Sequence, residues 1–294
     1  MHISVLLHES IEGLELKDGD VVFDGTFGGG GHTRAMLALG KKIKVIATDL
    51  DTDAIENGQE LVREYPDQLI LENDTFSNIA SILNKHNFSG VDKVLLDLGW
   101  SSNQLENGER GLSFLKDEPL VMTLKKDVTE SDVTAEMIVN EWSEETIADI
   151  LFGFGEERYA RRIARVICEQ RQNKPIKTTH ELVSIISRAV PPNYRFGKIH
   201  PATRTFQALR IAVNHELETL ETVLSEAWKV LKPEGRMSII SFHSLEDRIV
   251  KRFFREVAAE SNATIITKRP ITASEEEISY NPRSRSAKLR IIKK

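Results

Sequence analysis

Short apolar runs alternate with amphipathic stretches along the first third of the chain. Four runs have the length, the β-branched content and the flanking turn residues of buried strands: residues 21–23, 43–48, 69–71 and 91–96. Each of the first three is followed by a segment whose pattern favours a helix: residues 31–40, 52–64 and 77–86. Strands and helices that alternate at this spacing predict a parallel sheet with right-handed crossovers.

The next strand-like run, residues 236–242, comes late in the chain. The stretch between Leu98 and Gly235 is far longer than one crossover needs, and it contains helical patterns of its own at residues 135–151, 156–172 and 179–190. We therefore expect a helical domain between the fourth and fifth strands. The predicted domains are residues 1–104 and 201–294 for the two parts of the sheet domain and residues 105–200 for the insert.

The last third of the sequence returns the chain to the sheet. Pro201 begins a helical pattern that runs to Val230 as one long helix or two. Ser244 begins a further helix with a capping-box-like pattern, directly after the fifth strand. Residues 264–267 and 289–292 predict a closing antiparallel pair. The pattern thus predicts an α/β fold with a mainly parallel sheet, a terminal antiparallel hairpin and an all-helical insert.

Composition narrows the class of protein. The 294 residues are 40% hydrophobic and 29% charged, which is typical of a globular protein with a core of its own. The longest stretch without Asp, Glu, Lys or Arg is residues 75–84, too short to span a bilayer. No secretory signal pattern is present, so a cytoplasmic protein without membrane contact is expected. The single cysteine, Cys168, excludes an internal disulfide and a Cys-rich zinc site.

The charges are unevenly distributed although the net charge is only −6. Residues 127–157 hold ten acids and no Lys or Arg, whereas residues 188–215 hold five bases and residues 283–294 hold six, both without an acid. Each run alone is typical of a solvated surface. Two acid-free basic runs in one chain instead favour a polyanionic ligand.

A glycine-rich loop follows the first predicted strand. Five glycines occur among the seven residues 25–31, directly before a helix, so the backbone can approach a polar or anionic ligand closely. A Walker A loop needs Lys and Ser or Thr after the last glycine, but His32 and Thr33 stand there. The dinucleotide pattern G-x-G-x-x-G also fails, since its last position falls on Thr33 or Arg34. S-adenosylmethionine is the ligand class that remains, with nicotinamide binding as the weaker alternative.

Acidic residues end three of the predicted strands. Asp24, Asp49 and Asp97 end the first, second and fourth, at the sheet edge where open α/β folds bind ligands. Asp49 follows Gly31 by 18 residues, where an acid can bind ribose hydroxyls. A single such acid can simply cap the next helix. Three at neighbouring strand ends favour a binding site.

Several long motifs resemble the ribosomal small-subunit methyltransferase H family, also called the MraW family. The resemblance covers almost the whole chain, and its motifs are residues 2–9 (HISVLLHE), 24–32 (DGTFGGGGH), 97–102 (DLGWSS), 155–165 (GEERYARRIAR), 200–210 (HPATRTFQALR), 241–248 (SFHSLEDR) and 281–286 (NPRSRS). The family implies a Rossmann-like class I S-adenosylmethionine-dependent methyltransferase core with an inserted helical domain. It also implies methylation of the exocyclic N4 of cytidine 1402 in 16S ribosomal RNA.

The resemblance implies a set of cofactor-binding residues by motif match: Gly30, Gly31, His32, Asp49, Phe76, Asp97 and Gln104. Phe76 follows the third strand, where its ring can pack on adenine or belong to the core. The chain departs from the family pattern at Trp100 and Asn103, where Val and Pro are usual, and again in residues 117–127. These departures concern substrate placement rather than cofactor binding.

Two residues are candidates for the chemistry at cytosine N4. Asp97 is the first candidate for accepting a proton from the amine. His243, after the fifth strand, can reach the substrate or hydrogen-bond the next turn. Methylation at C5 would need a cysteine nucleophile, and Cys168 lies among core-type residues of a predicted helix. The histidines form no H-x-x-x-H pair, so no metal is expected.

The basic residues supply the expected RNA contacts. Arg158, Arg162 and Arg165 recur at helical spacing and form a stripe for phosphates, unless ion pairs such as Arg165 with Glu169 occupy them. The other candidates lie in the acid-free runs: Arg204, Arg210, Arg283 and Arg285. The resemblance implies 16S rRNA or the small ribosomal subunit as partner, with a partly assembled subunit as one candidate substrate, bound by a monomer or homodimer.

Two other functions remain compatible with this sequence. A Rossmann-type oxidoreductase would use the same fold, although the failed dinucleotide registers oppose it. A non-catalytic RNA-binding protein of ribosome assembly would keep the fold without transferring a methyl group, and the altered segment from Trp100 to Asp127 favours that alternative.

Overall fold

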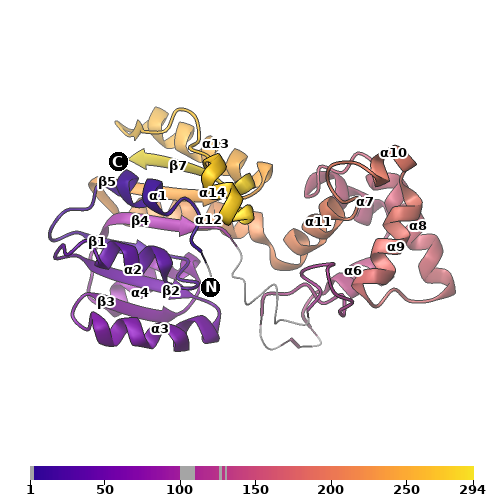
Figure 1. Cartoon of the computed structure of the whole chain (residues 1–294), viewed down its shortest axis with the longest axis horizontal. Helices are drawn as coiled ribbons and strands as arrows, with labels where there is room; N and C mark the ends of the chain where they lie inside the picture. Colours follow the sequence, from indigo (N-terminus) through magenta and orange to yellow (C-terminus); the bar gives the residue numbers. More distant parts are fainter. Residues whose placement is uncertain (1–2, 100–109, 126–127, 130) are drawn as a thin grey trace. The chain divides into compact units, whose positions relative to one another are not determined.

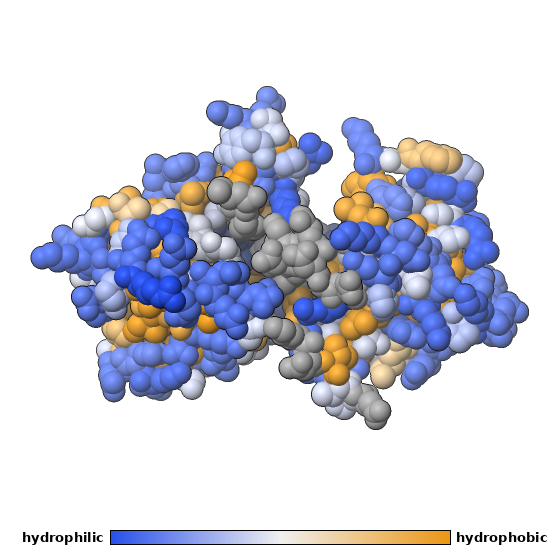
Figure 2. All heavy atoms as spheres, turned by 60° about the horizontal axis from the view of Figure 1, so that its bottom comes forward, coloured by the Kyte–Doolittle hydropathy of each residue, from blue (hydrophilic) through white to orange (hydrophobic). Residues whose placement is uncertain are grey.

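The computed structural model describes residues 3–99, 110–125, 128–129 and 131–294. The chain divides into two compact units, the first made of residues 1–101 and 217–294 and the second of residues 102–216. No helix in the described part of the chain is both long and apolar enough to cross a membrane. Figure 2 shows a largely hydrophilic face with separate small apolar areas.

The first unit is built on a seven-stranded sheet in the order β3-β2-β1-β4-β5-β7-β6 (Figure 1). Its strands are β1 (Val21–Asp24), β2 (Lys44–Asp49), β3 (Leu69–Asn73), β4 (Val91–Asp97), β5 (Leu231–Ser241), β6 (Thr264–Ile265) and β7 (Lys288–Lys293). The first five strands are parallel, and β7 runs antiparallel to both β5 and β6. The predicted α/β fold and its closing antiparallel pair are confirmed.

Helices cover both faces of this sheet. On β4, Val94 and Leu96 belong to one apolar cluster and Leu95 to another, because neighbouring side chains on a strand point to opposite faces. Both faces being buried explains why the strands read as unbroken apolar runs. One face packs on α4 (Ile79–Lys85), α12 (Glu216–Val230) and α13 (Ser244–Glu260), and the other on α1 (Leu7–Leu14), α2 (Gly31–Leu37) and α3 (Thr52–Glu64).

The first unit also contains an unpredicted helix, α1, and two 3₁₀ turns. Helix α1 was not predicted, although its apolar residues recur with the period of a helix. The segment before α1 packs Val5 and Leu6 against β5 and β7. Two 3₁₀ turns, η1 (Phe76–Asn78) and η2 (Pro282–Ser286), follow β3 and α14 (Glu275–Tyr280) respectively.

The second unit is helical and has its own core. Its helices among the described residues are α6 (Ala135–Glu141), α7 (Glu144–Gly153), α8 (Ala160–Asn173), α9 (Thr179–Ala189), α10 (Pro192–Arg195) and α11 (Thr203–Asn214). The pattern at 135–151 is two helices rather than one, because Trp142 and Ser143 are extended and the Ser143 hydroxyl caps α7.

The second unit ends later in the chain than the predicted limit at residue 200. Helix α11 buries Phe206, Leu209 and Val213 in the core of the helical unit, so the division falls after Glu216. His215, with φ +50°, separates α11 from α12, which answers the question of one helix or two. The start of the helical unit falls close to the predicted limit, among residues outside the described part.

Candidate functional site

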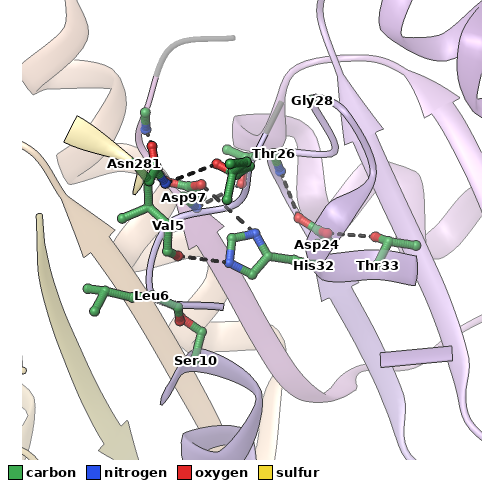
Figure 3. Close-up of polar contacts among 12 residues, drawn as sticks. Val5, Leu6, Ser10, Asp24, Thr26, Gly28, His32, Thr33, Asp97 and Asn281 are labelled. Carbon is green, nitrogen blue, oxygen red and sulfur yellow. Dashed lines mark hydrogen bonds and ion pairs between the residues drawn. The ribbon is translucent and has the colours of Figure 1, made fainter. Parts of the chain in front are cut away.

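Three acidic residues end the adjacent strands β2, β1 and β4, as predicted, but one of them is fully used within the fold. Asp24 is 1% exposed. Its Oδ1 accepts the Thr26 N–H at 3.1 Å, and its Oδ2 accepts the Thr33 hydroxyl at 2.6 Å (Figure 3). Burial raises the pKa of this carboxyl. Asp24 therefore ties both ends of the glycine loop to β1 and has little access to a ligand.

Asp49 fixes the middle of the same loop. Its Oδ2 accepts the Gly28 N–H at 2.7 Å, and its Oδ1 accepts the Asp51 N–H at 2.9 Å. Burial raises the pKa of Asp49 in spite of these bonds. Because a carboxylate can accept about four hydrogen bonds, Asp49 retains capacity for hydroxyl donors.

The loop needs glycine for two different reasons. Gly28 and Gly30 have φ values of +52° and +72°, which residues with a side chain rarely adopt. A Cβ on Gly30 would lie 2.8 Å from the Phe27 ring, so packing excludes it. A Cβ on Gly28 would meet nothing closer than the Thr26 carbonyl oxygen at 4.0 Å. The backbone at Gly28 is therefore open to an approaching ligand.

His32 and Asp97 lie side by side at the end of β4. His32, on the first turn of α2, is 5% exposed; its Nε2 lies 3.2 Å from the Val5 carbonyl oxygen and its Nδ1 lies 3.9 Å from Asp97 Oδ2 (Figure 3). The Asp97 N–H donates to the Thr26 hydroxyl at 2.7 Å. The Asp97 side chain is 15% exposed, and burial raises its pKa to about 6. His32 opposes this shift, whereas the charges of Asp24 and Glu246 add to it.

Phe76 begins η1 directly after β3 and is half-buried. A Cβ on Gly25 would lie 2.8 Å from the Phe76 Cβ, which places Phe76 against the glycine loop. Gln104, the remaining predicted cofactor residue, lies outside the described residues, as do Trp100 and Asn103.

His243 caps the helix that follows β5. Its Nδ1 accepts the Glu246 N–H at 3.4 Å, while Glu246 Oε2 accepts the N–H groups of Phe242 and His243. This is a capping box with His243 as its N-cap, one residue before the Ser244 of the predicted box. The helix itself begins at Ser244, as predicted. The Nδ1 atom of the imidazole thus caps the helix. The buried Nε2 atom lies 3.3 Å from Glu246 Oε1.

The predicted arginine stripe is only partly helical. Helix α8 begins at Ala160, so Arg158 precedes it and stacks on the rings of Tyr159 and Tyr194, at 4.8 and 4.7 Å from their centroids. Arg162 and Arg165 are exposed on α8. Arg165 pairs with Glu144 at 3.7 Å and not with the expected Glu169.

The remaining candidate arginines have different surroundings. Arg210 forms a bidentate ion pair with Glu216, with Nε–Oε1 and Nη2–Oε2 distances of 2.8 and 2.9 Å. Arg204 donates to the Glu156 carbonyl at 3.0 Å. Arg283 and Arg285 are exposed on η2, in the first unit. Cys168 packs against the core of the helical unit, and burial raises the pKa of its thiol.

Comparison with known proteins adds a decisive observation. The model of the MraW methylase family matches residues 1–294. The chain belongs to the MraW methylase family. It is 42% identical over 309 aligned residues to the ribosomal RNA small subunit methyltransferase H of Brevibacillus brevis, covering 100% of this chain and 98% of the relative. It is 48% identical to the protein of that name from Nostoc punctiforme, covering 100% and 94%. A solved rRNA methylase from Streptococcus thermophilus aligns with a TM-score of 0.45 at 13% identity, covering 100% of this chain and 99% of that one.

The residues of this MraW methylase fit S-adenosylmethionine, the cofactor of the family. The open backbone at Gly28 allows close approach, Asp49 retains acceptor capacity for ribose hydroxyls, and half-buried Phe76 offers an apolar surface. Helix α2 begins without a side-chain cap, which leaves the N–H groups of its first turn for a polar ligand.

Two kinds of contact in this site were not predicted from the sequence: those made by main-chain groups and those made by two threonine hydroxyls. The Val5 carbonyl meets His32, and the hydroxyls of Thr26 and Thr33 orient Asp97 and Asp24. A main-chain contact leaves no side-chain signature. The two threonines could have been noticed, since both stand in the glycine motif.

Proposed function

We propose that this chain methylates the exocyclic N4 of cytidine 1402 in 16S ribosomal RNA, with S-adenosylmethionine as methyl donor. Full-length relatives named as small-subunit rRNA methyltransferases support the RNA substrate. The observation that carries the chemistry is Asp97: a carboxyl at a strand end, beside the glycine loop, with a pKa raised to about 6.

An amine on cytosine is a weak nucleophile, because its lone pair is delocalised into the ring. Catalysis therefore depends on holding N4 in line with the methyl group and on removing an N4 proton as the new bond forms. When bound, the cofactor supplies a methyl group on a sulfonium. The Asp97 carboxylate takes the N4 proton; its raised pKa makes it a stronger base than an ordinary aspartate while leaving it ionised at neutral pH.

The glycine loop and its neighbours hold the cofactor in this proposal. Gly30, Gly31 and His32 bind its amino-acid portion through the first turn of α2. Asp49 accepts its ribose hydroxyls and Phe76 packs on the adenine. Gln104 is proposed as a further contact from its match to the family motif.

We assign RNA binding to the exposed arginines. Arg158, Arg162 and Arg165 lie at or on α8 of the helical unit, which we propose as the substrate-recognition domain. Exposed Arg283 and Arg285 and half-buried Arg204 are further candidates. Arg210 is left out, because Glu216 already engages its guanidinium through two bonds.

Transfer of labelled methyl groups to small subunits that lack the modification tests this proposal. The wild-type chain should produce N4-methylcytidine at position 1402, located by mass mapping, and Asp97→Asn should lose at least about a hundredfold in rate. Asp67→Asn, at an exposed position on another loop, is the matched control and should keep the wild-type rate. Cofactor binding without transfer to subunits or naked RNA would contradict the proposal and favour the assembly role.

A further inference from the structure

Both ends of the chain meet beside the cofactor loop, through motifs that the proposed chemistry does not use. We call residues 3–6 the N-terminal strap. The Asn281 side-chain amide donates to the Ile3 carbonyl at 3.2 Å, and the Leu6 N–H donates to Glu277 Oε1 at 2.9 Å. Glu277 and Asn281 are 7% and 6% exposed. Two buried side chains from the C-terminal region therefore hold the strap.

The strap is held in a conformation that the backbone does not favour. Leu6 has φ +49°, in the left-handed region that a residue with a branched side chain occupies only at an energetic cost. Its N–H is bound by Glu277, and its carbonyl accepts the Ser10 hydroxyl at 2.7 Å. The Leu6 side chain is fully buried against β5 and β7. These contacts fix the path of the strap at Val5, the residue before.

The strap in turn contacts the first turn of α2. A Cβ on Gly31 would lie 2.1 Å from the Ser4 hydroxyl oxygen, so the glycine at this position makes room for the strap. The Val5 carbonyl lies 3.2 Å from His32 Nε2 (Figure 3). A carbonyl only accepts hydrogen bonds, so His32 must carry a proton on Nε2. When the ring is neutral, the Nδ1 atom, which faces Asp97 Oδ2 at 3.9 Å, is therefore an acceptor.

We propose that the N-terminal strap, held by Glu277 and Asn281, fixes the tautomer of His32 so that Nδ1 can receive the proton that Asp97 takes from the substrate amine. This inference rests on the proposed function. In the balanced step, N4 forms a bond to the methyl carbon while the methyl–sulfur bond of the sulfonium breaks, its electron pair stays on the sulfur of the departing thioether, and N4 loses one proton to Asp97. The proton then passes to Nδ1 of neutral His32, which restores the carboxylate and forms an imidazolium. Glu277 and Asn281 act through the strap on His32 and are positioning residues.

Other ionisable groups near this pair act on the same proton. Asp97 interacts with Asp24 on β1 and with Glu246 on α13 besides His32, and both acids favour retention of a proton at Asp97. Transfer onto Nδ1 restores the negative charge that these acids repel, and the imidazolium beside the carboxylate offsets that repulsion. The strap matters because a ring with its proton on Nδ1 would have no acceptor there.

The direct test is ¹⁵N NMR of the histidine rings in the full-length, cofactor-free chain, with His32 assigned by comparison with His32→Gln. The wild type should show the Nε2–H tautomer. Asn281→Ala and Glu277→Ala should produce a mixture of tautomers. Glu277→Gln, which keeps an acceptor oxygen for Leu6, should retain the wild-type pattern, as should the matched control Glu276→Ala, at an exposed position on the same helix.

Kinetics then separate positioning from general damage. Asn281→Ala should lower kcat by about tenfold to a hundredfold, while the Kd for S-adenosylhomocysteine stays within about twofold. An Nδ1–H tautomer in the wild type, or an unchanged tautomer in folded Asn281→Ala and Glu277→Ala, would overturn the inference. If the tautomers change as expected but even the wild type transfers no methyl group to RNA, the strap is correct and the proposed function is wrong.

Discussion

Two buried aspartates at neighbouring strand ends differ in the hydrogen bonds that they already accept. Asp24 and Asp97 both have raised pKa values because both are removed from water. The Asp24 carboxylate accepts hydrogen bonds from Thr26 and Thr33, whereas the Asp97 carboxylate accepts, from the residues that the structure describes, one long bond from the Gly99 N–H at 3.3 Å. Asp97 is thus the carboxyl that keeps acceptor capacity for a substrate.

The raised pKa of Asp97 predicts a pH-dependent cost to stability. The pKa is about 6 in the fold against an ordinary 3.8, so the folded state binds the proton more tightly. Stability therefore falls as pH rises between these values, and the full cost, on the order of 2–3 kcal/mol, applies above pH 6. Asp97→Asn should raise the free energy of unfolding in urea at pH 8 and have little effect below pH 4. Equal effects at both pH values would exclude this explanation.

The start of helix α8 shows that arginines at helical spacing need not all lie on one helix. The spacing of the arginines suggests one continuous stripe, yet α8 begins only at Ala160, and Arg158 stacks on two tyrosines before it. Helix α11 contributes a different case, since its half-buried Arg210 pairs with Glu216. Charge runs in a sequence therefore overstate the surface that an RNA can contact.

Two arginine variants should separate RNA contact from structural pairing. Arg162→Gln, on the exposed side of α8, should weaken binding of small-subunit RNA and reduce the slope of log affinity against log salt by about 0.7–0.9, with unchanged thermal stability. Arg210→Gln should instead lower stability by about 1–3 kcal/mol, because Glu216, 13% exposed, loses its bidentate partner. Salt titrations and thermal melts of both variants measure this. An unchanged salt slope in Arg162→Gln would remove that residue from the RNA surface.

At the scale of the whole molecule, the two units carry different groups of candidate residues. The sheet unit carries the glycine loop, Asp49, Phe76 and Asp97, whereas the helical unit carries the arginines of α8. The helical unit is one continuous segment with its own core, and residues 117–127, where we expect the chain to depart from the family pattern, fall within that segment. Leu120 and Met122 are fully buried in that core.

The continuous segment 102–216 should therefore fold on its own. We expect a helical circular-dichroism spectrum, cooperative thermal unfolding and RNA binding without affinity for S-adenosylhomocysteine. Leu182→Ala, which empties a fully buried core position, should lower its melting temperature and serves as the control for a packed core. A non-cooperative melt of the wild-type segment would show that the helical unit depends on the sheet unit.

The sequence by itself determined the layout of the sheet, the helical insert and the glycine loop. Each depends on local properties: runs of apolar residues for buried strands, helical periodicity for the insert, and glycine where the backbone turns. The same local information placed Asp49 and Asp97 at strand ends. The family motifs also carried a strong resemblance, which the match along the whole chain confirmed.

Only the tertiary structure decided how these residues are used. It showed that Asp24 is hydrogen-bonded within the fold whereas Asp97 keeps acceptor capacity, that His243 caps a helix, and that α11 belongs to the core of the helical unit. It also brought Glu277 and Asn281 to the strap, which lies more than two hundred residues away in the chain. Contacts of this kind depend on long-range packing and on main-chain groups, which every residue shares. No local pattern in a sequence specifies them.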